Sequence, residues 1–173
     1  MPRATPLPRA DADRLDAWLA LDNQLCFALY SASLAMTKLY KPLLAPLGLT
    51  YPQYIVMLAL WEEDGQTVSA LGEKLALDSG TLTPLLKRLE AQGALTRERD
   101  AADERRVIVR LTAAGRRLKQ QARNVPPAVV RATGCELGEV AALTRQLGTL
   151  RQSLAAVTQA AGVDTLAEGA PAH

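Results

Sequence analysis

Two cysteines are the only side chains in this sequence whose types and positions suit covalent chemistry. The 173 residues include Cys26, Cys135 and a single histidine, His173, at the last position. A Ser-His-Asp triad or a zinc site needs imidazoles or clustered thiolates at suitable spacing. The sequence offers neither, so we expect no metal and no cofactor. Any reaction is predicted to be thiol chemistry, with Cys26 inside an apolar and aromatic helical run.

The composition fits one soluble domain or two small subdomains, because 49% of the residues are hydrophobic. No run of about 18 apolar residues is present, so no membrane span is predicted. The start of the chain has two arginines and three prolines but no apolar segment typical of a signal peptide. We therefore expect a cytoplasmic protein, in which a bridge between two distant cysteines is regulated rather than structural.

Basic residues are concentrated in one part of the chain. Residues 85–123 contain eleven lysines and arginines and five acids, a net charge of +6 in a chain whose total is +2. A positive field confined to so short a segment is typical of proteins that bind a polyanion, such as nucleic acid.

Hydrophobic periodicity predicts a series of helices. The first runs from residue 13 to about residue 41 and is followed by two prolines and a glycine. Shorter helices are predicted to begin at Thr50, at Thr67 and near Ser79, and the last of these ends at Gly93. On that last helix leucines occupy one face, while small, hydroxyl and basic residues occupy the other.

Two strand-like runs, residues 95–99 and 106–111, follow this helix and are joined by a polar segment. Short helices followed by a hairpin indicate a mainly α (α+β) fold, a winged helix-turn-helix. In such a fold one helix enters the major groove of DNA, and an arginine of the wing reaches the minor groove.

A coiled-coil seam is predicted near the end of the chain. Apolar residues from 140 to 157 recur at steps of three and four, which calls for a partner helix from the first helix or from a second copy. We therefore expect a homodimer that binds double-stranded DNA at a pseudo-palindromic operator, with half-sites about 10 base pairs apart.

These elements predict a division of the chain into five parts. In order they are a disordered tail (1–12), an N-terminal dimerisation and sensing helix (13–48), a winged helix-turn-helix domain (49–115), C-terminal dimerisation helices (116–160) and a flexible tail (161–173).

Between about residues 15 and 157 the chain resembles the MarR-type winged-helix repressors, and within them the organic hydroperoxide resistance regulators. The resemblance is carried by four segments: LDNQLCFALY at 21–30, LTYPQY at 49–54, LDSGTLTPLLKRLE at 77–90 and DERR at 103–106. The first and third are specific to the hydroperoxide regulators when they occur together, whereas the fourth indicates only the wider family.

The resemblance implies that Cys26 senses organic or lipid hydroperoxides and that Tyr30, Tyr40 and Tyr51 surround it. Tyr40 lies fourteen residues after Cys26, about 21 Å along a continuous helix, so it can reach only the thiol of the other subunit. Some family members carry a second, C-terminal cysteine. The resemblance to them implies an intersubunit disulfide between Cys26 and Cys135, although Cys135 is also readable as an incidental loop cysteine.

A second set of residues is predicted to contact DNA. Asp103 is expected to orient Arg105, the arginine that enters the minor groove. The residues expected in the major groove are Ser79, Thr81, Thr83, Pro84, Lys87 and Arg88.

Two other functions remain open. In a thiol peroxidase, Cys26 would turn over, but the sequence has neither a CxxC pair nor the strand and helix alternation of a thioredoxin-like fold, so we expect no enzyme. In a repressor gated by a small aromatic ligand bound between its subdomains, Cys26 would have no chemical role. Separately, the three tyrosines also fit a purely structural role, in which they fill a core that is poor in aromatic residues.

Overall fold

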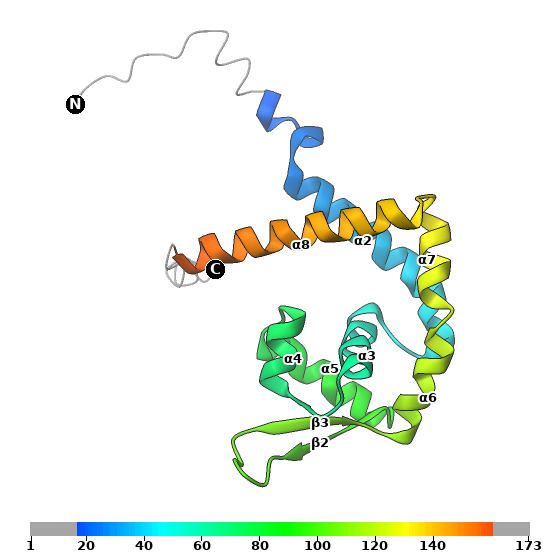
Figure 1. Cartoon of the computed structure of the whole chain (residues 1–173), viewed down its shortest axis with the longest axis vertical. Helices are drawn as coiled ribbons and strands as arrows, with labels where there is room; N and C mark the ends of the chain where they lie inside the picture. Colours follow the sequence, from blue (N-terminus) through cyan, green and yellow to red (C-terminus); the bar gives the residue numbers. More distant parts are fainter. Residues whose placement is uncertain (1–16, 161–173) are drawn as a thin grey trace, which may run out of the picture. The chain divides into compact units, whose positions relative to one another are not determined.

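The computed structural model describes residues 17–160, and the predicted tails, with His173, lie outside this range. The chain divides into two compact units, residues 1–126 and residues 127–173, and each is treated by itself. The elements follow in the order η1 (Leu21–Asn23), α2 (Leu25–Leu44), η2 (Ala45–Leu47), α3 (Tyr51–Glu62), β1 (Gln66–Thr67), α4 (Val68–Leu75), α5 (Ser79–Ala91), β2 (Leu95–Arg99), β3 (Val107–Leu111), α6 (Ala113–Ala122), α7 (Val125–Thr133) and α8 (Leu137–Ala160). The α-helices and the strands β2 and β3 are labelled in Figure 1. The mainly α winged-helix fold is thereby confirmed.

The single helix predicted from residue 13 to residue 41 is wrong at both ends. Gln24 is extended (φ −89°, ψ 111°), and α2 begins only after it. The side-chain amides of Asn23 and Gln24 donate to the carbonyls of Ala17 and Trp18, so polar side chains take the place of helical bonds at this point. Cys26 therefore lies in the first turn of a helix and not in the middle of one.

At its other end α2 continues through Pro42 as far as Leu44. The proline removes one backbone donor, but the N–H of Ala45 still bonds to the carbonyl of Lys41 and closes the last turn. The chain then turns through η2 to Gly48, whose φ of 66° ends the segment.

Helix α3 forms the centre of the first unit. It begins as predicted, where the N–H of Thr50 donates to the side chain of Gln53 at 2.9 Å. Its buried apolar residues lie on nearly all sides, with Tyr54, Val56 and Met57 each no more than 2% exposed. Helix α3 is therefore a core helix, buried around most of its circumference.

The wing is part of a three-stranded antiparallel sheet in the order β1-β3-β2. The predicted hairpin is confirmed, with Leu95 opposite Leu111 and Arg99 opposite Val107. The two-residue strand β1 was not predicted, because Gln66 and Thr67 show no apolar alternation.

Helix α6 packs closely on the base of the wing at Gly115. The carbonyl of Gly115 accepts a hydrogen bond of 2.9 Å from the indole N–H of Trp61. A Cβ atom at this position would lie 2.0 Å from the carbonyl oxygen of Ala94, which is far inside van der Waals contact. Only glycine permits this approach of α6 to the strand.

The carboxylate of Asp64, just after α3, connects that helix to strand β3 and helix α6. One oxygen accepts from the N–H of Leu111 at 2.8 Å, and the other accepts from the guanidinium of Arg116 at 2.7 Å. Burial raises the pKa of Asp64, but the hydrogen bonds from Leu111, Arg116 and Gly65 outweigh it and hold the pKa below its ordinary value.

In the second unit, Gly134 (φ 67°) separates α7 from α8. The predicted seam lies within α8, and Leu143, Leu147 and Val157 are 41% to 66% exposed. Within residues 17–160 no single helix meets the length and composition of a membrane span, although the bent pair Leu25–Leu47 and Tyr51–Glu62 does so jointly.

Replacing Gly115 with alanine is expected to destabilise the first unit by about 1–3 kcal/mol, because the added methyl group overpacks the contact with Ala94. Urea unfolding followed by circular dichroism, at one protein concentration, measures the effect. Gly138→Ala is the matched control, since no atom lies within 4 Å of its Cβ position. Equal stability of the two variants would contradict the close contact.

Asp64→Asn is expected to lower the free energy of unfolding by about 1–2 kcal/mol at pH 7, since it weakens charge-assisted hydrogen bonds. Because the folded pKa is depressed, this stabilisation is present above the ordinary value of 3.8 and is lost as the pH falls through the folded pKa. The difference between wild type and variant should therefore shrink below about pH 4. Asp22→Asn, at an exposed carboxylate, is the control. A difference that stays constant with pH would exclude this role.

Candidate functional site

Asp78 fixes the start of α5, the helix predicted to enter the major groove. Its carboxylate accepts bonds of 2.8 Å from both the N–H and the hydroxyl of Thr81. The hydroxyl and then the backbone N–H of Thr81 lower the pKa of Asp78. The hydroxyl proton of Thr81 is thus used within the cap, which leaves its oxygen as an acceptor.

The two faces of α5 differ in burial as well as in composition. Leu82, Leu86 and Leu89 are at most 1% exposed and form the inner face. Thr83 is half-buried at the edge. The remaining predicted DNA-contacting residues of α5 are exposed: Ser79, Thr81, Pro84, Lys87 and Arg88.

Pro84 lies inside the helix, in its second turn and not in the first. An interior proline lacks one donor and crowds the carbonyl four residues earlier. That carbonyl belongs to Gly80, and the burial of Leu82 and Leu86 on the inner face holds the helix together.

Arg105 lies at the tip of the wing with its side chain 91% exposed. Its Nε and its backbone N–H both donate to one carboxylate oxygen of Asp103 at 3.1 Å. A single acceptor therefore orders both the loop and the guanidinium, while the guanidinium's other donors face solvent.

The basic region contains fewer available charges than its sequence suggests. Arg97 is paired with Glu90 and Arg116 with Asp64, and Lys119 donates to the backbone carbonyl of Trp61. In the described part of the chain, no ion pair engages six of the basic residues: Lys87, Arg88, Arg99, Arg110, Arg117 and Arg123. Two of these, Arg99 and Arg110, are on the wing and were not predicted as DNA contacts.

Cys26 is exposed in the first turn of α2. Gln24, the residue before this helix, provides no side-chain cap. Uncapped N–H groups and the positive end of the helix dipole favour negative charge at this position. Tyr30 is one turn further along and is also exposed.

The other two predicted tyrosines lie against each other, with the ring centroids of Tyr40 and Tyr51 4.7 Å apart. Tyr54, which sequence reasoning missed, is 5.9 Å from Tyr40, and its spacing three residues after Tyr51 was the available signal. Burial, followed by the neighbouring Tyr51 and Tyr54, raises the pKa of Tyr40 to about 12. Because α2 is continuous from Cys26 to Tyr40, these residues of one chain are about 21 Å apart.

Cys135 lies between α7 and α8 and is exposed. Its thiol contacts the carbonyl of Thr133 at 3.6 Å, and the preceding Gly134 has a positive φ. Few contacts therefore hold this thiol in place.

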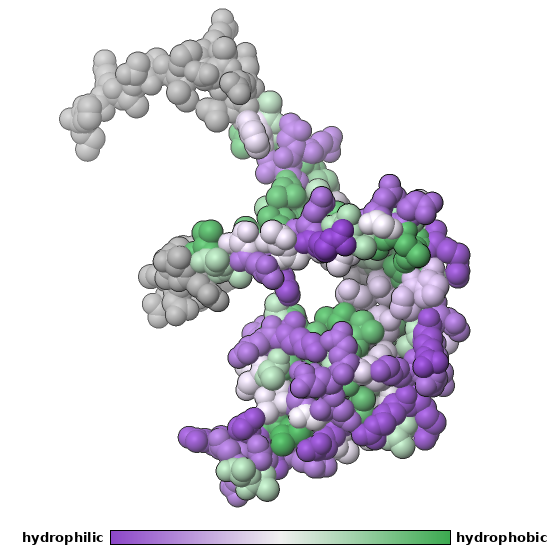
Figure 2. All heavy atoms as spheres, viewed as in Figure 1, coloured by the Kyte–Doolittle hydropathy of each residue, from purple (hydrophilic) through white to green (hydrophobic). Residues whose placement is uncertain are grey.

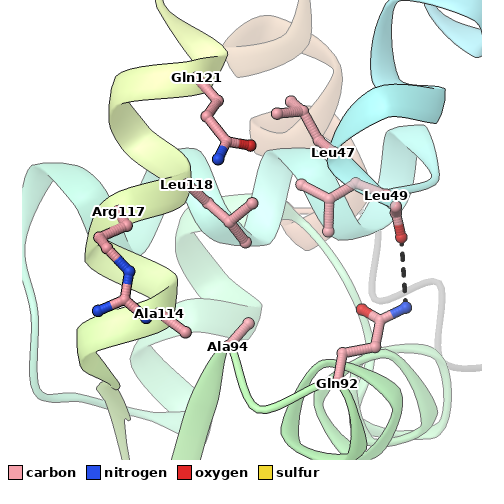
Figure 3. Close-up of a pocket in the computed structure, with 9 residues that line it drawn as sticks. Leu47, Leu49, Gln92, Ala94, Ala114, Arg117, Leu118 and Gln121 are labelled. Carbon is pink, nitrogen blue, oxygen red and sulfur yellow. Dashed lines mark hydrogen bonds between the residues drawn. The ribbon is translucent and has the colours of Figure 1, made fainter.

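Two hollows in the first unit are of interest. Figure 3 shows the first, a pocket of about 380 Å³ in which Leu49 and Leu118 face each other and Gln92 bonds to the carbonyl of Gly48. Arg117 is its only charged lining residue. The second, about 440 Å³, is lined by side chains that include Tyr51 and Lys41. Within residues 17–160 no group of three potential metal ligands occurs.

Three comparisons place these features among known proteins. A family model described as the transcriptional regulators SarA/Rot matches residues 38–122. The organic hydroperoxide resistance transcriptional regulator of Bacillus subtilis is 49% identical over 78% of this chain and 94% of its own length. The HTH-type transcriptional regulator TtmR of Methylorubrum extorquens is 52% identical over 78% of this chain and 69% of its own length.

Solved structures agree with these relatives. Reduced AbfR bound to DNA has a TM-score of 0.66 at 37% identity, over 82% of this chain and 99% of that one. A disulfide form of AbfR has a TM-score of 0.54 at 37% identity, over 80% and 98%. PcaV of Streptomyces coelicolor with its natural ligand has a TM-score of 0.69 at 26% identity, over 78% and 96%.

Because the match to the Bacillus subtilis regulator covers nearly all of that protein at 49% identity, it shows the family as well as the fold. The chain belongs to the MarR-type family of winged-helix transcriptional regulators, in its group of organic hydroperoxide resistance regulators.

Proposed function

We propose that the protein is a homodimeric repressor that binds DNA when Cys26 is reduced and loses that binding when an organic hydroperoxide oxidises Cys26. The observation that carries this proposal is the pair formed by Tyr40 and Tyr51, far from Cys26 of the same chain. Two phenols gathered in this way can surround the thiol only across a dimer interface.

DNA binding is supported by the first unit. Helix α5 presents hydroxyl and basic side chains opposite its buried leucines, and Arg105 is exposed at the wing tip. The structurally similar AbfR has been solved on DNA in its reduced form. We assign α5 to the major groove and Arg105 to the minor groove.

Dimerisation is supported by apolar side chains that a single chain leaves exposed. Leu25, Leu29 and Leu34 along α2 are 36% to 58% exposed, and four leucines of α8 are 41% to 71% exposed. Figure 2 shows hydrophobic residues at the surface among hydrophilic ones. Faces of this kind require a partner, and a second copy supplies matching ones. We include in the proposal a division into an N-terminal segment for dimerisation and sensing (13–48), a winged domain (49–115) and dimerisation helices (116–160).

The sensing reaction begins at the Cys26 thiolate. Its sulfur attacks the terminal oxygen of the hydroperoxide, a sulfur–oxygen bond forms, and the oxygen–oxygen bond breaks. The alkoxide takes a proton from solvent and leaves as an alcohol, while the sulfur becomes a sulfenic acid. Tyr40 of the partner subunit, which its raised pKa keeps protonated, donates a hydrogen bond to the anionic sulfur.

Cys135 is the proposed resolving thiol. Its thiolate attacks the sulfenic sulfur of Cys26 in the other subunit, a disulfide forms, and the sulfur–oxygen bond breaks. The departing hydroxide takes a proton from solvent and leaves as water. The exposure of Cys135 beside Gly134 suits a residue that must travel. The disulfide form of AbfR supports a bridge in a relative.

A ligand-gated repressor is the second candidate, because PcaV has been solved with its natural ligand. The pocket shown in Figure 3 has the size of a small-molecule site. It offers one charged residue, so it provides a weaker basis for recognition than the thiol and phenol arrangement. Cys26→Ser separates the two functions, since a ligand-gated repressor would respond to its ligand without the thiol.

Brief treatment of the reduced protein with cumene hydroperoxide is expected to produce a covalent dimer on a non-reducing gel, at twice the monomer mass. The band should disappear with dithiothreitol and should be absent in both Cys26→Ser and Cys135→Ser, because each removes one sulfur of the bridge. A band that persists in Cys135→Ser would rule out the resolving role. Release of DNA without any band would indicate a sensor that uses Cys26 alone.

Arg105→Ala is expected to weaken operator binding by about 1–3 kcal/mol, because a minor-groove contact is lost. Fluorescence anisotropy with the reduced protein measures the dissociation constant. Arg105→Lys, which keeps the charge but not the guanidinium, should recover only part of the loss. Unchanged affinity in Arg105→Ala would show that the wing does not reach the DNA.

A further inference from the structure

We propose that Arg99 binds a phosphate of the DNA backbone, on the stretch of strand that separates the groove occupied by α5 from the groove reached by the wing tip. The inference rests on the proposed function, in which both elements contact one duplex. It assigns a role to a wing residue that lies outside the predicted set of DNA contacts.

The first step concerns the face of the wing on which Arg99 lies. Side chains alternate along a strand, so Leu95, Arg97 and Arg99 share one face of β2. Leu95, and Val109 opposite Arg97 on β3, are at most 1% exposed. Arg97 reaches Glu90 on α5 from the same face. This row of residues therefore lies on the side of the sheet that faces α5.

The second step shows that Arg97, although basic, is unavailable to DNA. Its guanidinium donates to one oxygen of Glu90 at 2.6 Å and 2.9 Å, and its backbone N–H donates to the other at 3.0 Å. The guanidinium of Arg97 lowers the pKa of Glu90, so the pair remains charged at neutral pH. The pair holds β2 against the last turn of α5.

The third step concerns the next residue in the row. Arg99 is two positions further out, about 7 Å along the strand, and it is exposed. In the described part of the chain, no carboxylate lies within ion-pair distance of its guanidinium, and the adjacent Asp100 is paired with Arg106. Among residues 17–160, Arg99 is thus a cation without an ion-pair partner, on a strand whose position is fixed by Arg97.

Arg99 lies between α5 and the wing tip, and this position indicates which part of the DNA it contacts. If α5 lies in the major groove and Arg105 in the neighbouring minor groove, the hairpin must cross the sugar-phosphate backbone between them. A residue on the inner face of β2, between the contact with α5 and the tip, meets that backbone and not the base edges. Arg99 should therefore add affinity without adding sequence discrimination.

The test compares Arg99→Ala with Arg110→Ala. Arg110 is exposed on β3 opposite Thr96, so it lies on the outer face of the same hairpin. Both variants remove one positive charge from the wing, but only Arg99→Ala removes the proposed contact. Anisotropy titrations with the reduced protein use an operator duplex and a scrambled duplex, at salt concentrations from about 50 to 200 mM.

Arg99→Ala should weaken binding to both duplexes by the same factor, and that factor should shrink about threefold across this salt range, as loss of one phosphate contact requires. Arg99→Lys should restore the salt dependence. Two outcomes would overturn the inference when the wild type binds its operator. One is equal salt dependence of the two alanine variants, and the other is a loss of affinity in Arg99→Ala that is confined to the operator duplex. Failure of the reduced wild type to bind any operator would instead overturn the proposed function, and this inference with it.

Discussion

The arrangement of the first unit depends on the contacts made at the end of α3. The indole of Trp61 donates to Gly115, and Asp64, three residues later, accepts from Leu111 and Arg116. These bonds join the central helix to α6 and to the wing sheet at one place. The absence of a side chain at Gly115 makes the arrangement possible, since a Cβ atom there would overlap the carbonyl of Ala94. The position of the wing relative to α5 follows from this junction together with the Glu90–Arg97 pair.

Much of this architecture was predictable because its signals are local. Thr50, Thr67 and Thr112 precede helices that begin one residue later, and Gly93 follows α5. The start of α2 was not predictable, because apolar spacing continues across Gln24. The break depends on two side-chain amides that take backbone carbonyls six residues away.

The distribution of charge in the sequence did not predict which arginines are available to bind DNA. A count of basic residues treats Arg97, Arg99 and Arg116 alike, but Arg97 is paired with Glu90 on the preceding helix and Arg116 with Asp64, 52 residues away. Strand register and burial distinguish the structural arginines from the available one, and neither can be read from composition. Arg105 was predictable because its partner, Asp103, is two residues away in the same loop.

The break at Gln24 bears directly on how sensing connects to assembly. It places Cys26 at the start of α2, while Tyr40 lies near the end of that helix, against Tyr51 at the start of α3. A rigid helix keeps these groups apart within one chain, so a thiol that uses Tyr40 and Tyr51, in addition to its own Tyr30, must obtain those two phenols from a second chain. Under the proposed function, the protein would then sense peroxide only when assembled. Oxidation would change contacts between subunits from the outset, and those contacts set the spacing of the two α5 helices on DNA.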